Sequence, residues 1–240
     1  MKLSEIYSFL NELSPFELQE SWDNSGLIVG DIGADIQKIY LSLEPTLEVL
    51  EEIEPNSLLL THHPLIFSPL KRLDFGDITA RALRLAVQKN ISIIAMHTNY
   101  DKTHLNEYFA TTVMGFENIS KEGFLVYADV DMSFEELACL VKQKMGLSSV
   151  NCVQKNGKIQ KVAIVTGSGA SFLSKIDADC LITGDVKYHD AIFAMEKNIG
   201  MIDATHYATE AVFTASMHEN LKILPIKAII ANSKNPLKNF

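Results

Sequence analysis

Helical and strand-like patterns of apolar residues alternate along the first part of the chain. Residues 3–13 carry apolar side chains with the spacing of one helix face, and Pro15 ends this predicted helix. Continuous apolar runs that predict buried strands follow at 39–43, 58–60 and 91–96. Because helical patterns separate these runs, the sequence predicts an α/β fold with largely parallel strands.

Polar turn residues interrupt the pattern in the middle of the chain. Asn156 and Gly157 lie between strands expected near 149–154 and 161–166. This dipeptide is typical of a two-residue turn between antiparallel strands. The sequence therefore predicts a β-hairpin here.

The two parts of the chain share an order of elements. The strands expected at 58–61 and 180–183 each follow a strand–helix unit and lead into a polar loop. The strands at 91–96 and 200–204 each lead to a histidine with a carboxylate four positions later. This similarity predicts two related α/β halves, whose polar loops lie at the carboxyl ends of the strands, where open α/β sheets bind ligands.

The length and composition agree with two domains. The chain has 240 residues, of which 47% are hydrophobic and 21% charged, as in globular proteins rather than disordered ones. We expect two α/β domains with mixed sheets flanked by helices, at 1–118 and 119–240. The C-terminal segment is expected to pack back on the first domain.

Charge, apolar runs and cysteines exclude several classes of protein. The formal net charge of −9 argues against a broad basic surface for nucleic acid. No apolar run approaches the roughly 18 residues that cross a bilayer, and the N-terminus is unlike a secretion signal. The three widely spaced cysteines predict reduced, mostly buried thiols and no thiolate metal site. We therefore expect a cytoplasmic protein without a membrane partner.

Adjacent histidines follow the strand at 58–61. A turn at the end of this strand can direct His62 and His63 into one cleft, where each could bind one metal of a pair, and Pro64 stiffens that turn. The alternative is two ordinary polar loop residues.

Two histidine–carboxylate pairs have matching positions in the two halves. His97 precedes Asp101 by four residues, and His206 precedes Glu210 by four. On a helix this spacing places both side chains on one face, where they can share a cation. The alternative for each isolated pair is a surface hydrogen bond or a contact at a helix end.

Imidazoles and carboxylates without thiolates suit borderline divalent metals, namely zinc, iron, manganese, cobalt or nickel. Two such ions about 3.5–4 Å apart are typical of a hydrolytic centre, where the pKa of bound water falls to about 7. The sequence therefore predicts a two-metal site without indicating the metal.

Three other motifs carry weaker signals. The turn at 167–169 could contact an anion through backbone N–H groups, although a tight packing turn is the preferred interpretation. Lys187 could meet a phosphate and His189 could move protons, or both could lie on the solvated face of a helix that Asp185 caps. Trp22 could anchor a turn formed by Asp23 and Asn24, or it could pack along a purine.

Together these motifs resemble the family of GTP cyclohydrolase 1 type 2 homologs, also called NIF-three-like proteins. The resemblance covers nearly the whole chain, which looks like a short member because longer ones carry an inserted domain in the middle. The segments that carry the resemblance are Trp22-Asp23-Asn24, Thr61-His62-His63-Pro64, His97-Thr98-Asn99-Tyr100-Asp101, Thr166-Gly167-Ser168-Gly169, Thr183-Gly184-Asp185-Val186-Lys187-Tyr188-His189 and His206-Tyr207-Ala208-Thr209-Glu210.

The resemblance implies two similar α/β domains with a dinuclear metal site at the domain interface. It also implies a ring-like homohexamer built from dimers. His97 would take a secondary place beside the metal ligands, and Glu210 would bridge the two ions. The positions that match the family's ligands are His62, His63, Asp101, His206 and Glu210.

The leading functional hypothesis is a metal-dependent hydrolase with GTP cyclohydrolase I activity, which converts GTP and water to 7,8-dihydroneopterin triphosphate and formate through metal-activated water. His97 or His189 would shuttle protons, and Lys187 would steady the triphosphate. The alternatives are a dinuclear-metal phosphoesterase acting on nucleotides, or a non-enzymatic metal-binding hexameric scaffold.

Overall fold

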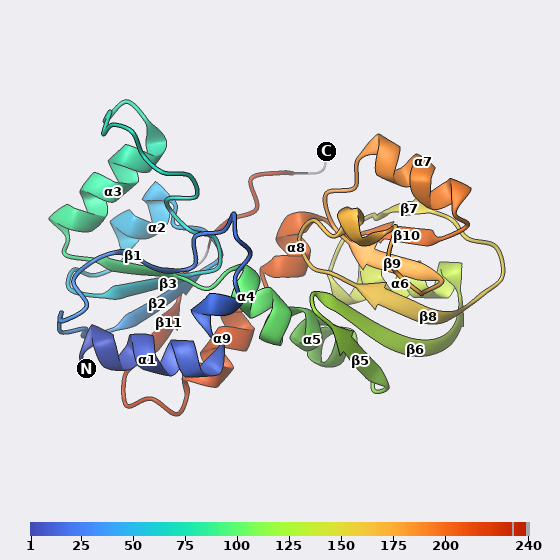
Figure 1. The fold of residues 1–240 in the computed structure, drawn as a ribbon, viewed down its shortest axis with the longest axis horizontal. Coiled ribbons are helices and arrows are strands. Elements are labelled where there is room, and N and C mark those ends of the chain that lie inside the picture. The colour runs from blue at the N-terminus through green and yellow to red at the C-terminus, as the bar shows by residue number, and fades with distance from the viewer. Residues whose placement is uncertain (232, 239–240) are drawn as a thin grey trace. The chain divides into compact units, whose positions relative to one another are not determined.

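The computed structural model describes residues 1–231 and 233–238 and divides into two compact units. The first unit comprises Met1–Tyr100 and the chain from Phe213 onward, and the second comprises Asp101–Val212. Figure 1 shows that each unit has its own sheet with helices packed against it. The predicted α/β class with mixed sheets is confirmed.

The first unit is built on a five-stranded sheet with the order β1-β4-β3-β2-β11, in which only β1 is antiparallel to its neighbour. Helices α2 and α3 pack on one face, and α1 and α9 cover the other (Figure 1). Strands β2, β3 and β4 are buried along their whole length, which explains their continuous apolar runs. The elements are α1 Leu3–Leu13, η1 Phe16–Leu18, β1 Gly26–Val29, β2 Ile39–Ser42, α2 Leu47–Glu52, β3 Leu58–Thr61, α3 Ile78–Gln88, β4 Ser92–Ala95, α4 Thr98–Tyr100, α9 Phe213–Leu221 and β11 Ala228–Ile230.

The second unit is built on a six-stranded sheet with the order β5-β6-β8-β9-β10-β7. Strands β8, β9 and β10 are parallel, and the other pairings are antiparallel. Apolar clusters on both faces join this sheet to α6 and to α7. The elements are η2 Asp101–Leu105, α5 Asn106–Tyr108, η3 Phe109–Val113, β5 Ile119–Glu122, β6 Leu125–Ser133, α6 Phe134–Lys144, β7 Asn151–Val153, β8 Lys158–Ile164, η4 Ala170–Phe172, β9 Cys180–Thr183, α7 Tyr188–Glu196, β10 Gly200–Asp203 and α8 His206–Glu210.

The two units repeat one topology. In the first, β1 lies antiparallel beside β4, followed by the parallel β3 and β2. In the second, β7 lies antiparallel beside β10, followed by the parallel β9 and β8. The repeated order of elements seen in the sequence is thus a repeat of sheet topology, and β3 and β9 occupy equivalent central positions.

The hairpin predicted around Asn156 and Gly157 is wrong. Both strands form, but β7 pairs with β10 rather than with β8. Strand β8 has β6 and β9 as its neighbours, so neither of its edges remains for β7. The turn residues Asn156 and Gly157 predicted the reversal of the chain correctly, but contacts distant in sequence determine which strand pairs with β7.

The boundary between the units falls at Tyr100 and Asp101 rather than after 118. The segment 101–118 belongs to the second unit because its apolar side chains, such as Phe109, are buried in the same cluster as the β6 and β8 residues Val126 and Ile164. At the other end of the chain, β11 continues the sheet of the first unit by pairing in parallel with β2.

The cysteines are less buried than their spacing predicts. Cys180 is buried, and burial raises the pKa of its thiol, whereas Cys139 and Cys152 are exposed. Within residues 1–231 and 233–238, no helix is both long and apolar enough to cross a lipid bilayer.

Asp179→Asn is expected to lower the free energy of unfolding by about 1–2 kcal/mol at pH 7. The Asp179 carboxylate accepts hydrogen bonds from Lys155 Nζ at 2.7 Å and from the backbone N–H groups of Gln160 and Lys161 at 2.9 and 3.1 Å. Burial raises the pKa of Asp179, but these bonds outweigh it and the net shift is downward. The carboxylate therefore stabilises the fold fully above its unfolded pKa of about 3.9 and loses this effect as the pH falls.

Urea unfolding at pH 7 and at pH 3.5 measures the difference between wild type and variant, which should shrink at the lower pH. Asp177→Asn is the matched control, because its side chain is 99% exposed and should leave the midpoint unchanged. Equal effects of Asp179→Asn at both pH values would contradict the assignment.

Candidate metal centre

Three histidines of the first unit lie at one edge of its sheet. His62 and His63 follow β3, and His97 follows β4, which is parallel to β3 and hydrogen-bonded to it. The ring centroids of His62 and His63 are 5.0 Å apart, and each is 5.1 Å from that of His97. One nitrogen from each ring lies within 4.8 Å of the others. The structure thus brings these three predicted site residues together.

Each of these imidazoles is held by an oxygen at its Nδ1. His62 donates to the Met96 carbonyl oxygen at 2.8 Å. His63 lies 2.6 Å from Glu44 Oε1, and His97 lies 2.7 Å from Asp23 Oδ1. Donation from Nδ1 fixes the tautomer in which Nε2 carries the lone pair, as is usual for histidines that bind metals. This donor set therefore fits a divalent metal.

Asp23 is the residue of this cluster that sequence reasoning missed. Its fully buried carboxylate accepts from His97, from the Thr98 N–H at 3.1 Å and from Ser25 Oγ at 3.1 Å. Burial raises the pKa of Asp23. Its hydrogen bonds and its electrostatic attraction to His97 lower the pKa by a larger amount, so the net shift is downward and the carboxylate stays ionised. Its place in the Trp22-Asp23-Asn24 motif was the available signal, but turn chemistry accounts for that motif equally well. Glu44 carried no such signal.

The second unit gathers a histidine and two carboxylates. His206 and Glu210 share one face of α8, with His206 Nε2 2.8 Å from Glu210 Oε2. A carboxylate oxygen of Asp101 lies within 4.8 Å of one of Glu210. The hydrogen bond with Glu210 raises the pKa of His206 to about 9, although burial opposes it. The helical spacing predicted for His206 and Glu210 is confirmed. Asp101 and His97 belong to different units, and their pairing stays a prediction.

Asp185 acts on His206 rather than as a helix cap. Its Oδ2 lies 2.7 Å from His206 Nδ1, so this imidazole is held as the three in the first unit are. Helix α7 begins only at Tyr188, with Lys187 as its N-cap residue. The predicted cap at Asp185 is therefore wrong, because the loop turns at Asp185 with a φ of 51° before the helix starts.

Gly167 allows Glu210 to approach the loop after β8. Its N–H donates to Thr209 Oγ1 at 2.9 Å, and a Cβ at this position would lie 2.0 Å from Glu210 Oε1. Its φ of +68° also favours glycine. The turn at 167–169 is therefore a close-packing turn, as the preferred interpretation had it.

Lys187 and His189 lie outside these donor sets. Both are exposed, and the centroids of the His189 and Tyr188 rings are 5.4 Å apart.

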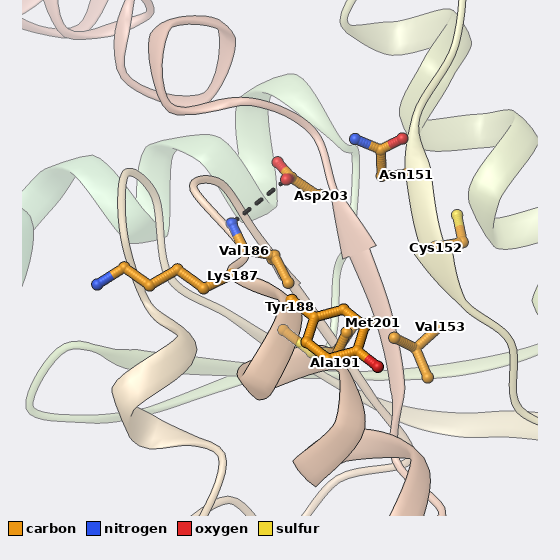
Figure 2. Close-up of a pocket in the computed structure, with 9 residues that line it drawn as sticks. All are labelled: Asn151, Cys152, Val153, Val186, Lys187, Tyr188, Ala191, Met201 and Asp203. Carbon is orange, nitrogen blue, oxygen red and sulfur yellow. Dashed lines mark hydrogen bonds between the residues drawn. The ribbon is translucent and has the colours of Figure 1, made fainter.

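Lys187 borders a cavity of about 220 Å³ (Figure 2). Its side chain extends away from Tyr188 and Met201. Among the described residues, no group of side chains able to hold a metal includes His189. The proposed proton-transfer and phosphate roles stay predictions. The cavity is lined by Asn151, Cys152, Val153, Val186, Lys187, Tyr188, Ala191, Met201 and Asp203.

Comparisons with known proteins agree on one family. The model of the Duf34/NIF3 (NGG1p interacting factor 3) family matches residues 1–236. A Campylobacter jejuni protein named GTP cyclohydrolase 1 type 2 homolog is 46% identical over 243 residues, which cover 100% of both chains. A Helicobacter pylori protein named GTP cyclohydrolase 1 type 2 is 45% identical over 238 residues, which cover 98% of each.

A solved structure has the same fold. The crystal structure of Staphylococcus aureus protein SA1388 superposes with a TM-score of 0.91 at 26% sequence identity, covering 100% of this chain and 99% of that one. The similarity extends over both units, so the fold described above is that of a known structural group.

Proposed function

This chain belongs to the Duf34/NIF3 family, and on that premise we propose that it is a metal-dependent hydrolase with GTP cyclohydrolase I (type 2) activity. Two relatives of about its own length bear the name GTP cyclohydrolase 1 type 2, one of them as a homolog. We further propose a cytoplasmic homohexamer, as the family resemblance implies.

The observation that carries the proposal is the common arrangement of four imidazoles. His62, His63, His97 and His206 each have an oxygen at Nδ1, which leaves Nε2 as the nitrogen that could bind a metal; on His206 the metal would replace the proton that Nε2 donates to Glu210. His104 also has an oxygen at Nδ1, from its neighbour Thr103, but it belongs to no group of potential ligands among the described residues, whereas each of these four does. Four imidazoles that come shortly after parallel strands, each beside other potential ligands, favour metal binding over unrelated hydrogen bonds.

We propose that both donor sets serve one dinuclear centre. The ligands would be His62 and His63 from the first unit, and Asp101, His206 and Glu210 from the second. Such a centre, when bound, supplies Lewis-acid chemistry and lowers the pKa of water to about 7. The absence of thiolates favours zinc, iron, manganese, cobalt or nickel without selecting among them.

The remaining residues of the site would position ligands and move protons. Asp23 holds His97 in one tautomer and, being ionised, would stabilise the imidazolium that forms when Nε2 takes up a proton. Asp185 would hold His206 in the same way. His97 is therefore the better candidate for proton transfer than His189, and Lys187 keeps its proposed role toward the triphosphate.

The proposed reaction opens the imidazole ring of guanine at C8, releases that carbon as formate and closes the pterin ring. Its net balance is one GTP and one water to one formate and one 7,8-dihydroneopterin triphosphate. Purified protein loaded in turn with each candidate metal should release formate and form a pterin that fluoresces after oxidation, in equal amounts. Phosphate release without formate would instead assign the phosphoesterase alternative. Tight metal binding without any product would assign the non-enzymatic scaffold.

A further inference from the structure

Two large aromatic side chains are exposed beside the histidines of the first unit. Trp22 is 56% exposed and Phe67 is 51% exposed. Their ring centroids are 5.9 Å apart, and they lie 6.1 and 6.4 Å from the centroid of His97. Single exposed apolar side chains are common, but two large aromatic side chains exposed together beside a histidine cluster are characteristic of a binding site.

The aromatic pair is held in place relative to the histidines. Trp22 immediately precedes Asp23, whose buried carboxylate is bound to His97 and Thr98. Asn24 Nδ2 donates to the carbonyl oxygen of Ile66 at 2.5 Å, which joins the loop of Trp22 to the loop that carries His63 and Phe67. The loops that carry this aromatic pair and the histidines are therefore joined by hydrogen bonds.

We propose that Trp22, supported by Phe67, forms a stacking platform for the planar heterocyclic base of the substrate. The platform would hold the base beside the histidine cluster, where a ring carbon could be attacked. The identity of the base rests on the proposed function, whereas the stacking itself does not.

The geometry decides how the base stacks. A ring inserted between two parallel rings needs a centroid separation of roughly 7 Å, twice the contact distance of about 3.5 Å. The rings of Trp22 and Phe67 are closer than this and inclined by 45°. The base therefore lies on the exposed face of Trp22 and meets Phe67 at its edge, an arrangement that aromatic rings favour.

The chain provides its own probe, because Trp22 is its only tryptophan. Titration of the metal-loaded protein with GTP should change the Trp22 fluorescence saturably, and ATP should do so as well, since stacking tolerates different bases. Inorganic tripolyphosphate, which has no base, should leave it unchanged. A response to tripolyphosphate equal to that of GTP would overturn the platform.

Variants test the energetic contribution. Trp22→Ala should weaken GTP binding by roughly 5- to 150-fold, the range that one base–aromatic stack contributes. Trp22→Phe should restore part of the affinity, and metal content should stay unchanged in both. Phe193→Ala is the matched control, because this aromatic side chain on α7 is 38% exposed, has no proposed role and should leave binding as it is.

The outcomes separate this inference from the proposed function. Saturable quenching by GTP without formate would refute the reaction and leave the platform standing. Formate release with the same KM in Trp22→Ala as in wild type would refute the platform and leave the reaction standing. A change in assembly size in Trp22→Ala, with nucleotide binding intact, would assign the pair to a contact between chains and overturn the proposal.

Discussion

Glu210→Gln is expected to reduce formate release from GTP by at least about 100-fold and to lower the bound metal per chain. The Glu210 carboxylate is 4% exposed and lies 2.8 Å from His206 Nε2, with Asp101 close by. A neutral amide has nearly the same shape but supplies no negative charge for a cation or an imidazolium. The substitution therefore removes the charge without opening a cavity. Formate release and elemental analysis of the dialysed protein are the two measurements.

A control must show that the effect belongs to the site. Glu196→Gln makes the same chemical change at an exposed position on α7 of the same unit, and it should leave both measurements unchanged. Circular dichroism melting of the two variants checks that both remain folded. Wild-type turnover in Glu210→Gln would remove this residue from the centre.

The local pattern of the chain was enough to place the first-unit histidines. The apolar runs of β3 and β4 marked buried parallel strands, and residues that follow such strands meet at one edge of a sheet. His62, His63 and His97 could therefore be grouped without coordinates. The spacing of His206 and Glu210 worked for the same reason, since a single helical turn fixes it.

The sequence could not reveal partners that depend on tertiary contacts. Asp23 meets His97 across 74 positions, and Asp185 meets His206 across 21. Local reasoning assigned both aspartates to turns and caps, which is what these residue types do most often. The pairing of β7 with β10 was hidden for a similar reason. The turn at Gly157 reverses the chain direction, but it does not determine which strand pairs with β7.

Gly167→Ala is expected to destabilise the second unit and to displace Glu210. The new Cβ would lie 2.0 Å from Glu210 Oε1, a separation that requires the carboxylate to move. The φ of +68° adds a backbone cost of about 1–2 kcal/mol for any residue with a Cβ. The overlap should add about 1–3 kcal/mol to this. Urea unfolding gives the total, and metal content should fall because Glu210 is a proposed ligand.

Gly146→Ala separates the two causes. Gly146 has a φ of +63°, and a Cβ there would meet nothing within 4 Å. This variant should therefore show the backbone cost alone and keep its metal. The second test places Gly167→Ala in a Glu210→Ala background, where the overlapping oxygen is gone and the nearest remaining atom, His206 Nε2, is at an ordinary 3.5 Å. There the loss of stability should fall to that of Gly146→Ala, because removing the partner removes the overlap. An undiminished loss in the double variant would show that Gly167 serves the backbone of its turn and does not make room for the carboxylate.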